Sequence, residues 1–176
     1  MDIKKSVLLG AILAGSVTMS LSAFAGGYVG VSMGNTDFDA PEDGSSYELK
    51  GGYKFNDNFA IQGSYINFGD IDDNEPPVWT MEVDAIELSA IGSFLLSDKI
   101  SLTGTLGFSS WDAAVTEEGF GNVGGTDGTD LFYGVGVSYS ISDTTSFEFL
   151  YKDYDVTVEG EDLELTNISA GLNFHF

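Results

Sequence analysis

After residue 25, apolar and small polar residues alternate with a period of two over stretches of about ten residues. A β-strand directs successive side chains to opposite faces, so this period predicts strands with one apolar and one polar face. A membrane helix would need about 20 consecutive apolar residues, and charges or glycines interrupt every later apolar run. We therefore expect an all-β fold whose strands are residues 27–38, 46–55, 59–68, 81–96, 100–113, 130–141, 145–157 and 163–176.

The connections between these stretches alternate in length. Three are short polar turns, at residues 56–58, 97–99 and 142–144, and Asn and Ser side chains suit such turns because they bond to nearby backbone. The other four are longer and acidic, and they contain all three prolines, where no ladder hydrogen bond is lost. Short turns at one end and long loops at the other predict an eight-stranded antiparallel up-and-down transmembrane β-barrel.

The two faces of the strands differ in side-chain size. One face carries large apolar residues such as Leu106 and Phe149, and the other carries Ser, Thr, Gly and a few charged residues. A soluble, lipocalin-like barrel would place the large face inside, whereas a membrane barrel would turn it toward lipid. Eight strands leave room inside for side chains and little more, so the small polar face fits the interior and the membrane assignment is favoured.

Two strand ends break this pattern. Met81 and Val83 are out of phase with Ile86, and Leu165 is out of phase with Ile168. Either a β-bulge shifts the face there, or these ends rise above the bilayer, where the phase is less constrained.

The inward face also carries charges of both signs in equal number. Buried charges must be paired, because an unpaired one costs several kcal/mol, so we expect a structural salt-bridge network inside the barrel. The alternative is an ion path, which eight strands leave little room for. The candidates are Glu48, Lys50, Lys54, Glu87, Glu148 and Lys152.

The first 25 residues have the pattern of a targeting segment. Lys4 and Lys5 precede an uncharged stretch at residues 6–25, which ends with small residues at Ala23 and Ala25. A transmembrane anchor is the alternative, but the small residues and the Ala-Phe-Ala end favour a signal peptide cleaved after Ala25. The barrel domain would then be residues 26–176.

Composition excludes several kinds of site. The chain has no Cys and a single His, at position 175, so it offers neither a thiolate site nor a multi-histidine zinc site. A formal net charge of -22 lacks the basic footprint of nucleic-acid binding. His175 is the only imidazole base, and it lies at the end of the last strand, away from the long loops. We therefore expect no enzyme and no tightly bound cofactor.

Most of the acidic residues fall in the long connections. Carboxylates in loops can hold Ca²⁺ or Mg²⁺ loosely, although plain solvation of such clusters is the commoner outcome. One segment partly mimics a calcium loop but has a glutamate where that loop needs glycine, and its candidate metal ligands are Asp70, Asp72, Asp73 and Glu75.

These features together resemble a known family. The Ala-Phe-Ala signal end, the glycine-rich start at residues 26–30 and a last strand that ends at Phe176 are similar to the eight-stranded outer-membrane β-barrels. That family includes the outer membrane protein A transmembrane domain, outer membrane protein X and the opacity proteins. The resemblance implies a Gram-negative outer membrane, short turns in the periplasm and surface-exposed loops. It also implies that the barrel assembly machinery recognises Phe176.

The resemblance leaves three functions to separate. A structural or surface-interaction role is the first, a narrow ion-conducting channel is the second, and a lipid-modifying enzyme is the third. In each case the expected partners are outer-membrane lipid and lipopolysaccharide, and the expected state is a monomer.

Overall fold

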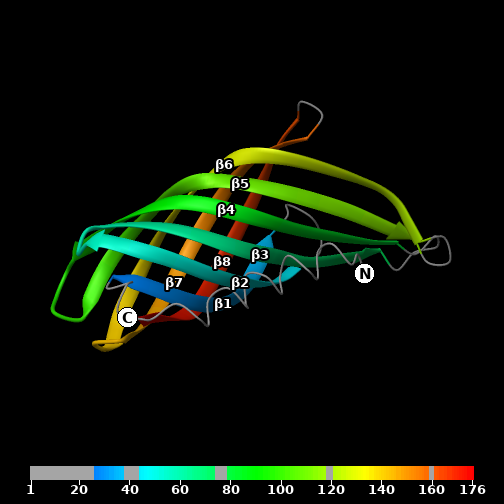
Figure 1. Ribbon diagram of the computed structural model, residues 1–176. Helices are drawn as coiled ribbons and strands as arrows, with labels where there is room; N and C mark the ends of the chain where they lie inside the picture. The colour runs from blue at the N-terminus through cyan, green and yellow to red at the C-terminus, as the bar shows by residue number, and fades with distance from the viewer. Residues whose placement is uncertain (1–25, 38–43, 74–78, 118–120, 159–160) are drawn as a thin grey trace.

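The protein is an eight-stranded closed barrel in which each strand pairs with the next along the chain and the last pairs with the first (Figure 1). The computed structural model describes residues 26–37, 44–73, 79–117, 121–158 and 161–176. Within these ranges, no helix is long and apolar enough to cross a membrane. The predicted signal peptide and the three prolines lie outside them. The strands are β1 (Gly27–Asp37), β2 (Gly44–Asn56), β3 (Phe59–Asp73), β4 (Trp79–Leu95), β5 (Ile100–Glu117), β6 (Gly121–Ser142), β7 (Thr145–Val158) and β8 (Glu161–His175).

The three short turns form as predicted, and they share one local chemistry. The Asn56 side-chain oxygen accepts the backbone amide of Asn58 at 2.9 Å, and the Ser142 hydroxyl accepts that of Thr144 at 3.3 Å. Ser97 accepts the backbone amide three residues on, at 3.2 Å. These side-chain bonds stabilise the turns locally. All three turns lie at the same end of the barrel as the C-terminus (Figure 1).

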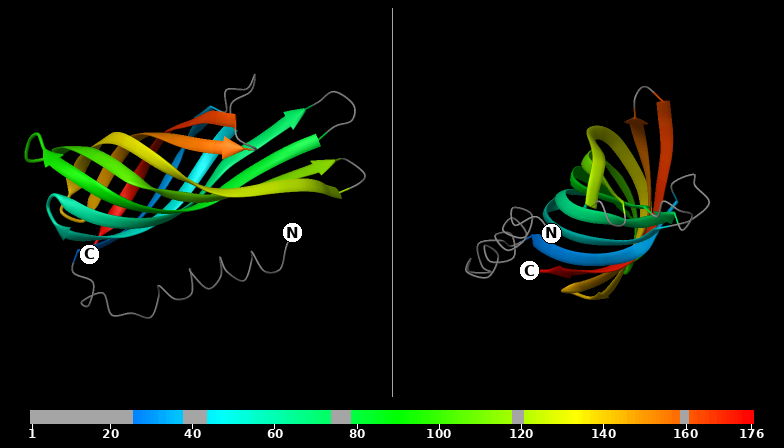
Figure 2. Two further views of the ribbon diagram at one scale, coloured as in Figure 1. Left: turned by 90° about the horizontal axis from the view of Figure 1, so that it is seen from above. Right: turned by 90° about the vertical axis from the view of Figure 1, so that its right-hand side faces the viewer.

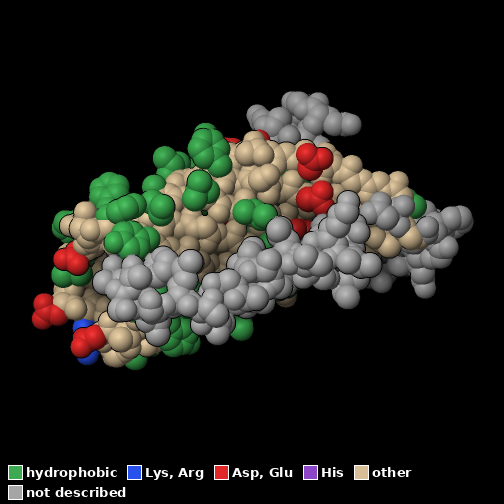
Figure 3. Space-filling view, viewed as in Figure 1, with side chains coloured by type: hydrophobic (Ala, Val, Ile, Leu, Met, Phe, Trp, Pro, Cys, Tyr) green, Lys and Arg blue, Asp and Glu red, His purple; other side chains and the backbone are tan. Residues whose placement is uncertain are grey.

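The face assignment is confirmed. The large apolar side chains point outward: Met33 is 75% exposed and Leu106 is 60% exposed, whereas neighbouring Thr105 is only 7% exposed. Figure 3 shows hydrophobic side chains covering the part of the barrel nearest the short turns, with acidic side chains further along it. An apolar surface of this extent marks contact with lipid, so the soluble, lipocalin-like arrangement is wrong.

Several strands are longer than the sequence pattern predicts. β6 begins at Gly121 instead of residue 130, β5 continues past residue 113 to Glu117, and β3 continues past residue 68 to Asp73. The extensions of β3 and β6 are rich in Gly and Asp, which have low strand propensity. They form strands because they pair with neighbouring strands, and local propensity does not take such pairing into account.

Of the two explanations for the phase break in β4, the structure rules out the bulge. Val83 and Ala85 are buried on the same side as Glu87, and the β4–β5 ladder runs without a shift from Trp79 to Leu95. In β8, Leu165 is likewise buried on the side of Asn167, and its ladder with β7 has no shift. The break in the sequence pattern therefore marks a change inside the barrel from polar to apolar residues.

A register shift does occur in β3, between Asn67 and Asp70. Gly69 lies between them with φ of 97°, a backbone conformation that favours glycine. The Asn67 side chain accepts the Gly69 amide at 3.0 Å. The bulge thus sits where a glycine permits it, one strand away from the predicted place.

Candidate functional site

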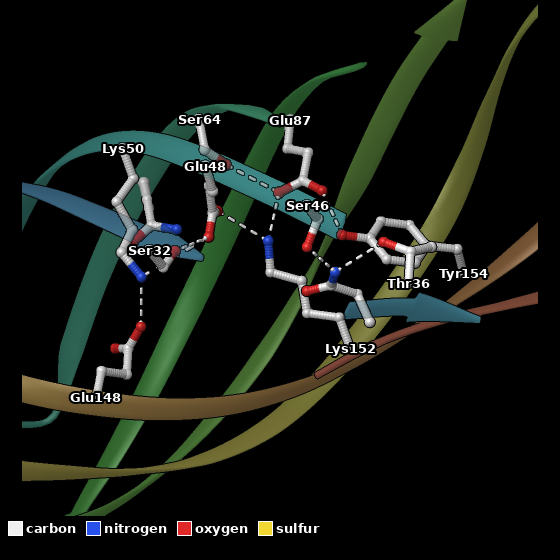
Figure 4. A network of polar contacts seen from close by, with 12 residues as sticks. Ser32, Thr36, Ser46, Glu48, Lys50, Ser64, Glu87, Glu148, Lys152 and Tyr154 are labelled. Carbon is white, nitrogen blue, oxygen red and sulfur yellow. Dashed lines mark hydrogen bonds and ion pairs between the residues drawn. The ribbon is translucent and has the colours of Figure 1, made fainter. Parts of the chain in front are cut away.

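Five of the six predicted interior charges meet in one buried network (Figure 4). Lys152 on β7 is fully buried, and its Nζ lies 2.8 Å from Glu48 Oε1 and 2.7 Å from Glu87 Oε2. Lys50 contacts Glu148 and lies 3.8 Å from Glu48 Oε2. Because β7 is not a neighbour of β2 or β4 in the barrel, the contacts of Lys152 cross the interior.

Hydroxyl groups complete the network around its carboxylates. Ser32 donates to Glu48 at 2.8 Å, and Ser64 donates to Glu87 at 2.8 Å. The Tyr154 hydroxyl donates to Glu87 at 2.6 Å. Buried ions are tolerated when such bonds satisfy their remaining lone pairs. Sequence reasoning missed these donors, although each lies on the inward face of its strand.

An aromatic layer covers the network on the side away from the short turns. The Tyr154 ring stacks on Phe132 at 5.2 Å between centroids and meets Phe68 edge-on at 5.1 Å. Lys152 Nζ lies 5.3 Å from the Phe132 centroid, a cation–π distance. A Cβ on Gly107 would lie only 2.8 Å from the Phe132 ring, so glycine makes room for that ring. The layer was not predicted from sequence, and it extends into a cluster of Ile66, Val83, Ala85, Trp111, Ala113 and Leu165.

The sixth predicted charge, Lys54, lies apart from the network. It lines a cavity of about 520 Å³ at the short-turn end, together with Glu148 and His175. His175 Nε2 lies 2.9 Å from Ser146 Oγ, and its ring is tilted against Tyr28 at 5.6 Å. His175 is thus a satisfied interior residue at the short-turn end.

At the opposite end, the outward face carries a row of acids on three adjacent strands. Asp84 on β4 is directly opposite Asp112 on β5, and Asp112 is directly opposite Asp127 on β6. On the inward side of this sheet, Trp111 Nε1 donates to Asp130 at 2.6 Å. Like charges at directly opposite positions destabilise a ladder, so this row would be relieved by positive charge.

Three of the four predicted metal ligands lie in a strand of the barrel. The backbone of Asp70, Asp72 and Asp73 belongs to β3 and pairs with β4, and Glu75 lies outside the described residues. Across the part of the chain that the structure describes, no group of three or more His, Cys, Asp or Glu side chains is arranged to hold a metal ion.

Comparisons with known proteins agree with this architecture. The family described as "Outer membrane protein beta-barrel domain" matches residues 6–176. Comparison with curated proteins finds no significant match.

Solved structures of the same shape include barrels from Neisseria, Yersinia and Pseudomonas. Neisserial surface protein A has a TM-score of 0.70 at 18% identity, with 86% of this chain and 97% of that chain covered. The attachment invasion locus protein Ail of Yersinia pestis has a TM-score of 0.61 at 19% identity, with 85% and 96% covered. The N-terminal barrel of Pseudomonas aeruginosa OprF has a TM-score of 0.59 at 16% identity, with 84% and 97% covered. At these identities the likeness shows a shared fold, and together with the family match it establishes that this chain belongs to the outer membrane protein β-barrel domain family of Gram-negative outer membranes.

Proposed function

We propose that this outer-membrane barrel does not conduct ions and that it acts through its outer end, as a surface-interaction protein. The observation that carries the proposal is the closed interior. Lys152 joins carboxylates from across the barrel, and the Phe132–Tyr154 layer lies directly over it. A conducting pore would need a continuous water-filled path, which these side chains interrupt.

The outer end offers the surface for such a role. Short turns face the periplasm in barrels of this kind, so the long connections face outward. There, β3 to β6 extend well beyond the level of the buried network (Figure 2). Loops and edges held on a rigid scaffold are the usual place for binding residues.

The proposal includes the surroundings of the barrel. The outward apolar belt contacts outer-membrane lipid and lipopolysaccharide, and the protein works as a monomer after insertion by the barrel assembly machinery. The structure of Ail was determined in complex with the heparin analogue sucrose octasulfate. The acidic outer end of this chain would repel such an anion, so that ligand is not part of the proposal.

Planar-bilayer recording tests the closed interior. The purified barrel should give no regular conductance steps, because the network and the aromatic layer block the path. The cavity at the short-turn end is the feature that favours the channel alternative. Regular steps in the wild type that Tyr154→Ala enlarges would establish the channel and overturn the proposal.

Labelling on intact cells tests the orientation. The chain has no cysteine, so Thr126→Cys in β6 and Asp98→Cys in a short turn each introduce a unique thiol. A membrane-impermeant maleimide should label the Thr126→Cys variant and leave the Asp98→Cys variant unlabelled until the cells are opened. The reverse pattern would place the acidic end in the periplasm.

The contact between Ser146 and His175 is the observation that favours an enzyme. Nucleophilic serine chemistry needs a base that a third group orients, and this contact lies at the end opposite the outer leaflet. We assign it a structural role. Lipid A mass spectra of a deletion strain should match those of the wild type, and a changed lipid A would contradict this assignment.

A further inference from the structure

The strand β6 has a long edge that its neighbour β7 does not cover. Its ladder with β5 runs from Gly121 to Tyr139, whereas its ladder with β7 begins only at the Phe132–Tyr154 pair. Among the described residues, no strand pairs with the β7 side of residues 121–131. Beyond Tyr154, β7 continues in a hairpin with β8, which leaves the barrel in a different direction from β6 (Figure 2).

This edge is exposed but held in place. Val123, Thr126 and Asp127 are exposed, and a Cβ on Gly124 would meet no other atom within 4 Å. The inner face is fixed by Trp111, which lies against Gly128 across the β5–β6 pair and donates to Asp130 at 2.6 Å. The edge is therefore an ordered row of backbone groups and not a loose loop.

Proteins usually protect such edges. Lysine or proline on the strand, a covering segment or a very short strand are common devices. Residues 121–131 contain no lysine and no proline, and the register shift in this hairpin lies near its tip, between Val115 and Thr116. An unprotected ordered edge is the geometry that accepts an added strand from another protein.

The charge around the edge selects the partner. Asp127 stands beside Asp112 in the acidic row, and Asp153 and Asp155 lie on β7 on either side of Tyr154, where the ladder with β6 ends. The described lysines lie elsewhere: Lys50 and Lys152 are in the buried network, and Lys54 and Lys99 line the cavity at the short-turn end. A strand that carries positive side chains would relieve the repulsion within the row, whereas a second copy of this chain would add more acid.

We propose that residues 121–131 of β6 receive, by strand addition, an extended segment rich in lysine or arginine from another protein. This inference rests on the proposed surface-interaction role and names its partner class. Backbone hydrogen bonds to β6 hold the segment. Its outward side chains lie beside Asp127 and Gly125, which share the outward face of β6, while Trp111 packs against Gly128 on the inward face.

The test uses the whole barrel in detergent micelles and synthetic peptides of about ten residues, a usual strand length. The probe alternates lysine with valine or threonine. One control peptide replaces lysine with glutamate. Two others carry N-methyl groups on alternate residues, one at odd and one at even positions, and only one of these two blocks the amides that face β6.

Three results are expected. The lysine probe binds, the glutamate peptide does not, and one N-methylated peptide binds at least about tenfold more weakly because it loses several backbone hydrogen bonds. Asp127→Asn weakens binding by up to about fivefold, whereas the matched Asp98→Asn change in a short turn has no effect. Hydrogen exchange of backbone amides in residues 121–131 slows when the probe is bound.

Other outcomes overturn the inference. Equal binding of both N-methylated peptides, or binding with no slower exchange in residues 121–131, would show charge attraction without strand addition. Concentration-dependent dimers that protect the same amides would show that the edge pairs with a second copy. No binding at all, together with correct surface labelling and no conductance, would reject this inference and leave the proposed function standing.

Discussion

A single lysine determines how the barrel interior is closed. Lys152 reaches two carboxylates on strands that are not its neighbours, and three hydroxyl groups hold those carboxylates in turn. Burial makes such a cluster intolerant of partial removal, because an uncompensated charge cannot be solvated. The same burial makes neutral replacement of a whole pair far less costly.

Lys152→Met should lower the free energy of unfolding by about 3–5 kcal/mol, since it removes the cation that Glu87 contacts and the nearer of the two that Glu48 contacts. Adding Glu87→Gln should recover a clear part of that loss, because Glu48 still has Lys50. Urea unfolding of the barrel in phospholipid vesicles measures both. Lys99→Met in a short turn is the control and should change stability by less than about 0.5 kcal/mol.

If the effects of Lys152→Met and Glu87→Gln were additive within about 0.5 kcal/mol, the two groups would be hydrated independently. The interior would then contain water where we describe direct ion pairs.

At the scale of the strand, each β-strand faces lipid on one side and the barrel interior on the other. β5 alternates outward residues such as Leu102 and Leu106 with inward residues such as Thr103 and Thr105. β8 closes the barrel on β1, and the Phe176 backbone extends this closure with bonds of 3.0 Å to Gly26 and to Gly27.

Leu106→Arg should destabilise the barrel by about 2–4 kcal/mol, the cost of arginine on the lipid face near the bilayer midplane. Thr105→Ser, one residue away on the inward face, should change little. Folding yield and urea unfolding in lipid vesicles distinguish the two. Wild-type yield for Leu106→Arg would reject the face assignment.

Phe176→Ala should reduce assembly in cells while leaving refolding in detergent nearly intact. The side chain is exposed at the barrel rim, and the substitution keeps the backbone bonds of residue 176. Phe174→Ala, another exposed aromatic on β8, is the matched control and should assemble better. Normal outer-membrane levels of the Phe176→Ala variant would remove the terminal side chain from any role in assembly.

At the scale of the whole molecule, charge and apolar surface are separated along the barrel axis. Apolar side chains form the belt nearest the short turns, and acids gather beyond it (Figure 3). Among the described residues, the buried network holds Lys50, Lys152 and three glutamates, and the row of Asp84, Asp112 and Asp127 lies at the outer end.

The chain found in the outer membrane should begin at Gly26, after removal of the signal peptide at Ala25. N-terminal sequencing of the purified barrel checks this. Ala25→Pro should block cleavage and leave a longer product. A wild-type product that retains Lys4 and Lys5 would establish the membrane anchor instead.

Much of the fold could be predicted from local pattern. The period of two, the turn residues and the volume available inside eight strands were sufficient for the barrel, its order and its two faces. The extension at residues 121–129 was missed, because a Gly-rich segment looks like a loop until a neighbouring strand pairs with it. The phase break at Val83 left a bulge and a strand end above the bilayer as alternatives, because an inward apolar residue looks the same in sequence as a shifted register.

The candidate site divides in the same way. Sequence alone determined which charges face inward, since that depends only on the alternation along each strand. Tertiary structure alone decided which of them meet, because barrel closure brings β7 across the interior to β2 and β4 and leaves Lys54 at the cavity. It also decided that β6 extends beyond its ladder with β7 and so has an unpaired edge. The length of a ladder depends on both strands, whereas the sequence pattern describes only one strand at a time.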